Sequence, residues 1–519
     1  MKKCRIIPRF DVKGPNVVKG IQLEGLRVVG KPADFSRKYF EQGADEIVYI
    51  DIVASLYERN SLLEVIEQAT ELGVAIPLTV GGGIRSLEDI RKILRAGADK
   101  VAINTAATRA PEFISQAAQM FGNQCIVGSV QAKRQSDGGW EAYVDNGRER
   151  TGKDAVAWAR ELVRLGAGEL LITSVDREGT RKGMDIELIR QITDGVHVPV
   201  IAGGGAGSEQ DIVDCFDQTG CDAVSFASLL HYNQTTIGQV KQALSSQRVP
   251  VRFKDGTEKQ GRKGAMQEDG GRRMHAYLAE ELNGSGSAKI SIVDYGLGNL
   301  RSVAKAFETL GHTVRFVHNG EEVLQSQLLV LPGVGSFADG MRGLAQRRLI
   351  EPIRSYAEQG RPLLGICLGM QLMMSYSEEY GYHRGLDLIP GTVASFQDPA
   401  QVCERSYHVP HVGWNEIYPA QGDNSWDDTI LQDTVSQTDF YFVHSYKVMP
   451  EKRDHLLAAT TYGGQVFCSV VRSGNLYGTQ FHPERCGTEG LAILKNFTRL
   501  ADDSTMRRVN RDSTELVTK

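Results

Sequence analysis

The sequence has no long apolar run, no cysteine pair of metal-binding spacing and no large excess of one charge. No stretch of about 18 consecutive apolar residues occurs, so we expect no membrane-spanning helix. Its 8 cysteines form neither a C-x-x-C pair nor a Cys/His cluster, which indicates reduced thiols, and we expect no metal and no cofactor. The net charge of -5 gives no reason to expect nucleic acid or an anionic membrane as a partner.

The amino-terminal segment also lacks the features of an export signal. Residues 1–10, MKKCRIIPRF, contain no apolar core and no cleavage site, so we expect a cytoplasmic protein. Glycine, in contrast, is abundant, and its 56 residues predict tight turns and close approach of the backbone to ligands. A chain of 519 residues is too long for one hydrophobic core and predicts several domains.

Residues 1–253 alternate short Val/Ile-rich runs with stretches of helical period, which is typical of repeated β/α units around a parallel sheet. Eight units in about 250 residues is the size of a (β/α)8 TIM barrel, and an open doubly wound sheet is the alternative. The eight runs are IIPRFD (6–11), EIVYID (46–51), IPLTVG (76–81), KVAIN (100–104), IVGSVQ (126–131), ELLITS (169–174), PVIAGG (199–204) and AVSFAS (223–228).

An internal repeat supports the barrel. The segment GGGIRSLEDI (81–90) returns as GGGAGSEQDI (203–212). We therefore expect two half-barrels, in which the first and fifth apolar runs are equivalent. On this register Asp11 and Gln131 face each other across the C-terminal mouth, where barrel enzymes place their chemistry.

The repeat also predicts two anion-binding places at this mouth. Gly-rich turns that follow strands and lead into helices bind phosphate, because their free backbone N–H groups point at the anion. Two such places indicate a substrate with a phosphate at each end, and the alternative is that the glycines only form turns. The predicted residues are Gly82, Gly83, Asn104 and Thr105 in the first half, and Gly204, Gly205, Ala227 and Ser228 in the second.

Three further segments follow the barrel. Residues 254–287 are Gly-rich and charged without an apolar face, so we predict a flexible linker between domains. Residues 288–500 resume the alternation of strands and helices and predict a second α/β domain. Residues 501–519 form a polar tail that we expect to be disordered.

The second domain contains a candidate nucleophile. In RPLLGICLGMQLMM, Cys367 lies at a Gly-bracketed turn between an apolar strand and a helical run, which is the arrangement of a nucleophile elbow. The segment YGTQFHPE supplies His482 as a base and Glu484 as the carboxylate that orients it. For either residue alone, the alternative is a core cysteine or a histidine that ends a strand. The turn LPGVGSF supplies backbone for an oxyanion hole, at Gly333, Val334 and Gly335.

This domain resembles a known family. The motif GICLGMQ with a distant FHPE resembles the class I glutamine amidotransferases, and DYGLGNL, PGVGSF, VPHVGWN and YFVHSY narrow the resemblance to the glutaminase of the imidazole glycerol phosphate synthase family. The resemblance covers about residues 288–498 and implies a flavodoxin-like α/β fold. It also implies that the three residues just described form the catalytic triad, that Gly335 and Gln371 lie near the bound L-glutamine, and that ammonia is passed on.

The barrel resembles the cyclase of the same family, through GGGIRSLEDI, ADKVAINTAA, FGNQCIVGS, TSVDREGT and PVIAGGGAG. The resemblance implies that a bisphosphorylated formimino-ribonucleotide reacts with ammonia, giving imidazole glycerol phosphate and an aminoimidazole carboxamide ribotide in histidine biosynthesis. Two aspartates act in that family as base and acid. This chain has Asp11 at the first position and Gln131 at the second, and glutamine cannot transfer a proton in the working pH range. Asp176, Lys19 or a bound water is then the candidate acid.

Four charged residues stand at the starts of four apolar runs. Arg5, Glu46, Lys100 and Glu169 are predicted to form a ring of two positive and two negative charges at the bottom of the barrel. On composition alone this is a structural set of salt bridges, whereas the resemblance implies a gate for ammonia. The predicted linker is long enough to let the glutaminase domain dock on that face.

Three interpretations remain open. The first is a bifunctional fusion that makes imidazole glycerol phosphate with a substitute acid. The second is a paralogue that supplies ammonia to a separate sugar amidotransferase in surface-polysaccharide synthesis, with a barrel that does not cyclise. The third is a barrel whose ligand regulates the glutaminase.

Overall fold

The described residues of the computed structural model are 3–54, 62–254, 288–402, 407–420 and 426–501. The predicted linker (254–287) and tail (501–519) lie outside these residues except for their first positions, so the predicted domain boundaries stay predictions. No helix in the described part of the chain is long and apolar enough to cross a bilayer.

Eight parallel strands close into a barrel in the N-terminal half, as predicted. The pairing of β7 with β10 closes the sheet, which excludes the open doubly wound alternative. The strands are apolar runs because both of their faces are buried. They are β1 (Arg5–Lys13), β4 (Ile47–Asp51), β5 (Leu78–Gly81), β6 (Lys100–Ile103), β7 (Ile126–Arg134), β10 (Glu169–Ser174), β11 (Val200–Gly203) and β12 (Ala223–Phe226).

Helices surround the barrel, and two of them begin alike. Ser86 and Ser208 each cap a helix in a reciprocal capping box with an aspartate three residues later, at equivalent positions of the predicted repeat. The two half-barrels therefore share local structure as well as sequence. The helices are α1 (Pro32–Glu41), α3 (Leu62–Glu71), α4 (Leu87–Ala96), α5 (Thr105–Arg109), α6 (Glu112–Phe121), α7 (Ala155–Arg164), α8 (Ile186–Thr193), α9 (Glu209–Thr219), α10 (Ser228–His231) and α11 (Ile237–Ser246), with the 3-10 turn η1 (Asn123–Cys125).

Two antiparallel extensions rise from the mouth of the barrel. The first and fifth barrel strands, β1 and β7, each continue into two further strands. They start from equivalent strands of the two half-barrels, and their turns meet, since Asn146 donates to the Leu23 carbonyl at 3.4 Å. They are β2 (Asn16–Ile21), β3 (Glu24–Gly30), β8 (Trp140–Val144) and β9 (Glu149–Asp154).

The C-terminal domain is built on a mixed sheet. Its parallel part has the strand order β14-β13-β15-β16-β25, which is 2-1-3-4-5 along the chain and is the predicted flavodoxin-like order. The parallel strands are β13 (Lys289–Val293), β14 (Thr313–Val317), β15 (Leu328–Gly333), β16 (Leu363–Cys367) and β25 (Leu476–Thr479).

Further strands and helices complete this domain. The strands are β17 (Tyr376–Ser377), β18 (His383–Arg384), β19 (Gly391–Ser395), β20 (His411–Pro419), β21 (Thr438–His444), β22 (Tyr446–Pro450), β23 (Leu456–Tyr462) and β24 (Gln465–Ser473). The helices are α13 (Leu300–Thr309), α14 (Gly320–Leu324), α15 (Phe337–Gln346), α16 (Ile350–Glu358) and α17 (Leu368–Leu372), with the 3-10 turns η3 (Pro399–Gln401), η4 (Arg453–His455) and η5 (Pro483–Arg485).

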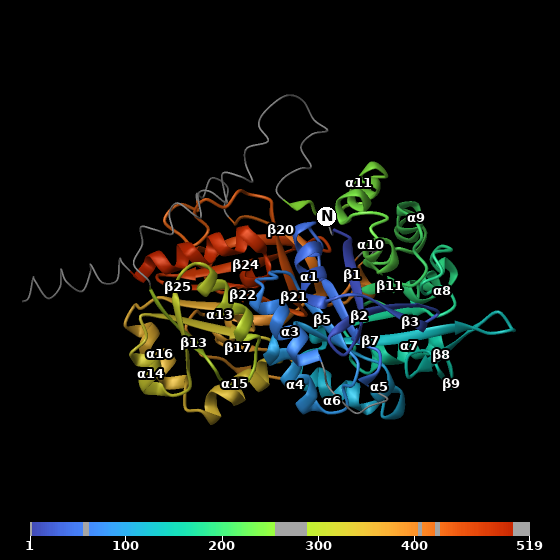
Figure 1. Cartoon of the computed structure of the whole chain (residues 1–519). Helices are drawn as coiled ribbons and strands as arrows, with labels where there is room; N and C mark the ends of the chain where they lie inside the picture. The colour runs from blue at the N-terminus through green and yellow to red at the C-terminus, as the bar shows by residue number, and fades with distance from the viewer. Residues whose placement is uncertain (1–2, 55–61, 255–287, 403–406, 421–425, 502–519) are drawn as a thin grey trace, which may run out of the picture.

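The two domains dock at the bottom of the barrel, as expected (Figure 1). Trp414 donates its Nε1–H to the Asp45 carbonyl at 3.1 Å, and the guanidinium of Arg252 lies 3.8 Å from the centre of its ring. Lys3 binds Asp439 at 2.6 Å. One hydrophobic cluster runs through both domains, so the C-terminal domain is packed against the starts of the barrel strands.

Candidate active site

Cys367 is the last residue of β16 and lies at a sharp turn. Its φ of 51° and ψ of -106° put a non-glycine residue in strained backbone, as at a nucleophile elbow, and its side chain is buried. Cys367 is paired in register with Gly333 of β15, so the turn formed by residues 333–335 lies beside it. The fold therefore brings together the residues predicted for the nucleophile and for the oxyanion hole.

His482 and Glu484 follow β25, the strand next to β16. The Nδ1 atom of His482 lies 2.8 Å from Oε1 of Glu484, and both side chains are buried. Burial lowers the pKa of His482, but the charges of Cys367 and Glu484 and the hydrogen bond to Glu484 raise it well above its ordinary value. The other ring nitrogen, Nε2, has no hydrogen-bond partner among the described residues, so it is available to accept a proton.

A small pocket lies beside Cys367 and is lined by both domains. Its volume of about 10 Å³ has room for about one water molecule, so glutamine enters only if lining side chains move. Gln371 donates to the Tyr446 carbonyl at 3.2 Å. Gln124 of the barrel donates to the Gly335 carbonyl at 3.3 Å, so the barrel touches the predicted oxyanion turn directly.

Glu379 is a pocket residue that the sequence patterns do not single out. It is 4% exposed, and its carboxylate accepts a hydrogen bond from the Phe337 backbone N–H at 2.5 Å. Burial raises the pKa of Glu379 to about 7, although the hydrogen bond from Phe337 opposes the rise. The two adjacent glutamates of SYSEEY were the only sequence signal, and only the fold distinguishes buried Glu379 from exposed Glu378.

The four residues of the predicted ring meet at the bottom of the barrel. Arg5 and Lys100 each lie 2.8 Å from a different oxygen of Glu46. Both cations also bind Glu169, so each contacts both carboxylates, and all four side chains are at most 1% exposed. Burial raises the pKa of Glu169, but Arg5 and Lys100 outweigh it and lower the pKa. Glu169 is therefore ionised, and the ring is closed because each cation contacts both carboxylates.

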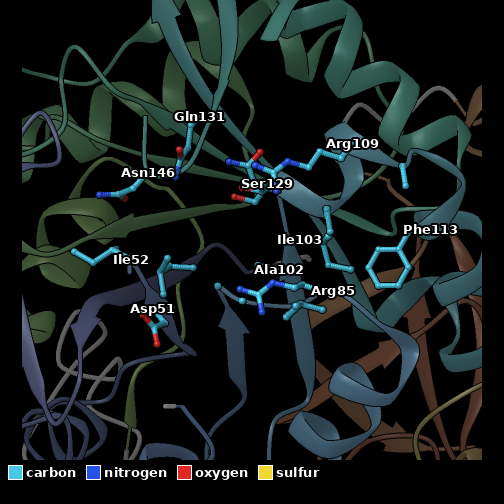
Figure 2. Close-up of a pocket in the computed structure, with 18 of the residues that line it drawn as sticks. Asp51, Ile52, Arg85, Ala102, Ile103, Arg109, Phe113, Ser129, Gln131 and Asn146 are labelled. Atoms are coloured by element: carbon cyan, nitrogen blue, oxygen red, sulfur yellow. The ribbon is translucent and has the colours of Figure 1, made fainter. Parts of the chain in front are cut away.

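A cavity of about 420 Å³ opens in the first half-barrel at the mouth. The four residues predicted for the first phosphate place line it, together with Arg85 and Arg109 (Figure 2). Gln131 and Asn146 line another side, and their side-chain oxygens have no hydrogen-bond partner among the described residues. The buried carboxylate of Asp51 lines the cavity as well, as Figure 2 shows, so the lining combines arginines and glycines with neutral amides and acidic groups.

Asp11 belongs to a buried cluster of four charges above the barrel interior. It accepts hydrogen bonds from Arg9 Nε at 3.0 Å and from Lys19 Nζ at 2.9 Å, and Lys19 also binds Glu178. Burial raises the pKa of Asp11, but Arg9 and Lys19 outweigh it and lower the pKa to about 2. Asp11 is therefore a carboxylate throughout the working pH range.

The two side chains that were predicted to replace the missing acid, Lys19 and Asp176, lie in different surroundings. Lys19 contacts Asp11 directly and is 3% exposed. Asp176 accepts a hydrogen bond from the exposed backbone N–H of Arg134 at 2.6 Å, away from the buried cluster. Gln131 lies on β7 beside Thr173 of β10. Of the two side chains proposed to replace the acid, only Lys19 contacts the predicted base among the described residues.

The second phosphate place is covered by the loop that follows β10. A Cβ on Gly204 would lie 3.3 Å from Oε2 of Glu178, and a Cβ on Gly205 would lie 2.2 Å from the Gly183 carbonyl oxygen. The Gly183 N–H also donates to the Gly205 carbonyl at 3.0 Å. A carboxylate therefore stands beside the turn that was predicted to bind phosphate.

Known proteins match both halves of the chain. The family model "Histidine biosynthesis protein" matches residues 5–236, and the model "Glutamine amidotransferase class-I" matches residues 291–500. The "Imidazole glycerol phosphate synthase subunit HisF" of Legionella pneumophila is 56% identical over 211 residues, which cover 41% of this chain and 99% of the relative. The subunits of the same name from Lactococcus lactis subsp. cremoris (strain SK11) and from Synechocystis sp. (strain ATCC 27184 / PCC 6803 / Kazusa) are each 49% identical, over 48% of this chain and 96% of each relative.

The matches agree with the two sites described above. The barrel carries the predicted ring and the mouth cavity, and the C-terminal domain carries the Cys–His–Glu arrangement. The chain is thus a glutamine amidotransferase enzyme of class I with a HisF-like cyclase barrel. It belongs to the imidazole glycerol phosphate synthase family, with the cyclase-like barrel placed before the amidotransferase domain in one polypeptide.

Proposed function

We propose that the C-terminal domain hydrolyses L-glutamine at Cys367. His482 takes the thiol proton, the thiolate attacks the carbon of the side-chain amide, and the imidazolium gives the proton to the departing ammonia. Water then hydrolyses the thioester, which releases glutamate and restores the thiol. The observation that carries this proposal is the 2.8 Å contact of His482 with Glu484 beside the strained turn of Cys367.

The rest of the pocket has the groups that this substrate needs. Backbone N–H groups of Val334 and Gly335 stabilise the oxyanion that forms when the thiolate attacks. Gln371 helps to hold the glutamine, and the buried carboxylate of Glu379 binds its α-ammonium group. Binding of this cation then favours the ionised form of Glu379, whose pKa is about 7 when the pocket is empty.

Ammonia then passes from this pocket through the barrel to the mouth. The pocket includes Gln124 of the barrel, so the path to the barrel bottom needs no exit to solvent. The ring of Arg5, Glu46, Lys100 and Glu169 lies across this path and acts as its gate. Because all four salt bridges are buried, ammonia passes only when at least one of them opens.

The acceptor is the bisphosphorylated formimino-ribonucleotide of imidazole glycerol phosphate synthesis. Relatives that are about half identical to the barrel carry the name of the cyclase subunit. Two predicted phosphate places, one in each half-barrel, suit a ligand with two phosphates, and Asp11 is ionised and able to accept a proton.

A second candidate is the supply of ammonia to a separate sugar amidotransferase. The observation that favours it is Gln131, which has no proton to give, together with Arg9, which holds Asp11 in an ion pair. In this case the barrel passes ammonia on, and it catalyses neither ring closure nor C–N cleavage.

Turnover of the formimino-ribonucleotide with glutamine or with ammonium as nitrogen source tests these proposals. Cys367→Ala should lose glutamine hydrolysis and glutamine-dependent turnover, and should keep ammonium-dependent turnover. Cys468→Ala is the matched control, because Cys468 is also buried but lies on β24. Glutamine hydrolysis by the Cys367 variant would mean that another residue is the nucleophile. Natural protein that hydrolyses glutamine but turns over no ribonucleotide with ammonium would leave the sugar amidotransferase as the acceptor.

A further inference from the structure

Gln480 is a fully buried glutamine behind the glutaminase nucleophile. It follows β25 directly, in the segment YGTQFHPE, and it is 0% exposed. Its backbone N–H donates to the carbonyl of Ser469, on the neighbouring strand β24, at 2.9 Å. Gln480 is not among the described residues that line the pocket beside Cys367. Its side chain therefore approaches the nucleophile from inside the protein.

The side-chain amide of Gln480 joins two residues of the glutaminase site. Its Oε1 accepts a hydrogen bond from Gln371 Nε2 at 3.2 Å. Its Nε2 donates to Sγ of Cys367 at 3.7 Å, and the longer distance reflects the larger radius of sulfur. One buried amide thus connects a residue proposed to hold the substrate with the atom proposed to attack it.

The direction of these hydrogen bonds follows from a backbone carbonyl. Gln371 Nε2 also donates to the Tyr446 carbonyl oxygen at 3.2 Å, and a carbonyl oxygen only accepts. Gln371 therefore presents its NH2 group on this side, and the second hydrogen of that group goes to Gln480 Oε1. The other end of the Gln480 amide, its NH2 group, then faces the sulfur. Turning either amide around would set acceptor against acceptor or donor against donor.

The contact with the sulfur favours the thiolate over the thiol. A neutral sulfur is a weak acceptor, whereas hydrogen bonds to an ionised acceptor are about twice as strong as neutral ones. Among the described residues, the sulfur is the acceptor for the buried NH2 group of Gln480, so this group is well satisfied only when the sulfur is charged. The neutral thiol donates instead to the Val443 carbonyl, at 3.9 Å. The amide thus stabilises the state after proton transfer more than the resting state.

We propose that Gln480 is a catalytic residue of the glutaminase site, whose amide donates a hydrogen bond to the thiolate of Cys367. This inference rests on the proposed role of Cys367 as the nucleophile. The thiol proton moves to Nε2 of His482, the negative charge stays on Sγ, and Gln480 keeps its own proton while it donates. Gln371 has a second task in this arrangement, because it holds the Gln480 amide in the donating orientation.

Alkylation of Cys367 tests this inference without any substrate. The full chain is treated with iodoacetamide, which reacts with thiolates, and modification of the peptide that contains Cys367 is followed by mass spectrometry. Gln480→Met keeps the length of the side chain and removes the donor, so alkylation at a pH of about 7 should slow about tenfold. The difference should shrink as the pH rises to about 9, because the thiolate then forms without the amide.

Two results would overturn the proposal. The first is an equal alkylation rate for the natural protein and the Gln480 variant near neutral pH. The second is a deficit of the variant that persists undiminished at the higher pH, since a defect of packing would not be relieved by deprotonation of the thiol.

Ser469→Ala is the control for this experiment. It removes a hydroxyl group that is 0% exposed and has no hydrogen-bond partner among the described residues. Because Ser469 lies beside Gln480 on β24, the variant changes packing nearby without removing a donor to the sulfur. The alkylation rate of Cys367 should therefore stay that of the natural protein.

A second variant covers the case in which circular dichroism shows that Gln480→Met does not fold. Gln480→Glu keeps the shape of the side chain and the acceptor for Gln371. At a pH of about 9 its carboxylate cannot donate and repels the thiolate, so alkylation should be slower than in the natural protein. An equal rate at that pH would again overturn the proposal.

Failure of this inference is distinguishable from failure of the proposed function. Alkylation uses neither glutamine nor an ammonia acceptor, so it reports on the sulfur alone. Loss of glutamine hydrolysis in Cys367→Ala, in contrast, does not depend on Gln480. If that loss occurred while Gln480→Met was alkylated at the natural rate, Cys367 would remain the nucleophile and Gln480 would be a structural residue.

Discussion

Gln131 and Arg9 together determine which proton transfers the barrel mouth can support. A carboxylate at position 131 would stand beside Thr173, the residue that Arg9 contacts. With glutamine there, the carboxylate that Arg9 contacts is Asp11, whose pKa is about 2. Asp11 is then always ready to accept a proton but never holds one near neutral pH. Cyclisation in this barrel would need a proton donor other than residue 131, and of the two side chains predicted to replace the acid, Lys19 is the one that contacts Asp11.

Glu379 is expected to give glutamine binding a pH dependence, because the proposed contact with the α-ammonium group needs an ionised carboxylate. Its pKa of about 7 means that the carboxyl group is protonated below that pH in the empty pocket. The neutral form cannot attract the α-ammonium group of glutamine, so the KM for glutamine should rise about tenfold for each pH unit below 7. Initial rates of glutamine hydrolysis between pH 5.5 and 8, at about half-unit steps, measure this dependence.

Variants of the two adjacent glutamates test whether Glu379 is the cause of this pH dependence. Glu379→Gln should have a raised KM at every pH and should lose the dependence, since its side chain does not ionise. Glu378→Gln is the matched control, because Glu378 is exposed, and it should keep the natural profile. A Glu379 variant whose KM still rises below pH 7 would show that a different group binds the ammonium.

At the scale of elements, the barrel strands were predictable because each is an apolar run bounded by turns. The run ELLITS (169–174) coincides with β10, and KVAIN (100–104) differs from β6 by one residue. The triad was predictable for a related reason, since a cysteine between a strand and a helix and a histidine at the end of another strand meet at the same edge of a parallel sheet. The fold brings these groups together as expected, and their catalytic roles stay predictions.

The strands at the mouth were not predictable in the same way. β3 (Glu24–Gly30) has mostly exposed side chains, so it shows no apolar run, and its strand conformation depends on pairing with β2. Contacts between distant segments could not be predicted from the sequence either. The bond from Arg9 to Thr173 and the approach of Glu178 to Gly204 depend on barrel closure, which no local pattern encodes.

Glu178, which also pairs with Lys19, lies beside the predicted second phosphate place and is expected to compete with phosphate. Its carboxylate lies beside Gly204, where an incoming phosphate would have to displace it or bear its repulsion. Glu178→Gln removes this charge and keeps the shape, so the protein should bind inorganic phosphate about tenfold more tightly. Titration calorimetry at constant ionic strength measures the change.

Glu187→Gln is the control for this titration. Glu187 lies in the neighbouring α8 and is 48% exposed, so its replacement should leave phosphate affinity unchanged. Equal affinities for the natural protein and the Glu178 variant would mean that phosphate does not bind at Gly204.

At the scale of the whole molecule, the triad is fixed to the barrel by the residue that follows Glu484. Arg485 is 1% exposed and binds both oxygens of Asp99, at 3.0 Å and 2.9 Å. It also donates to the carbonyl groups of Val74 and Ile76, at 3.3 Å each. The 3-10 turn that carries Glu484 therefore has its position set by the bottom of the barrel, so docking and glutaminase geometry are coupled.

Two interdomain arginines allow this coupling to be tested. Arg485→Met leaves Asp99 buried without its bidentate partner, which should lower the free energy of unfolding by about 3–5 kcal/mol and should also slow glutamine hydrolysis. Arg301 pairs with Glu67 across the same interface at 3.1 Å but is 48% exposed. Arg301→Met should therefore cost about 0–1 kcal/mol and leave hydrolysis unchanged. Urea unfolding and glutamine hydrolysis, measured on the full chain, give both quantities. If Arg485→Met lost stability but kept full glutaminase activity, the triad would hold its geometry independently of docking, and the barrel would act only as the recipient of ammonia.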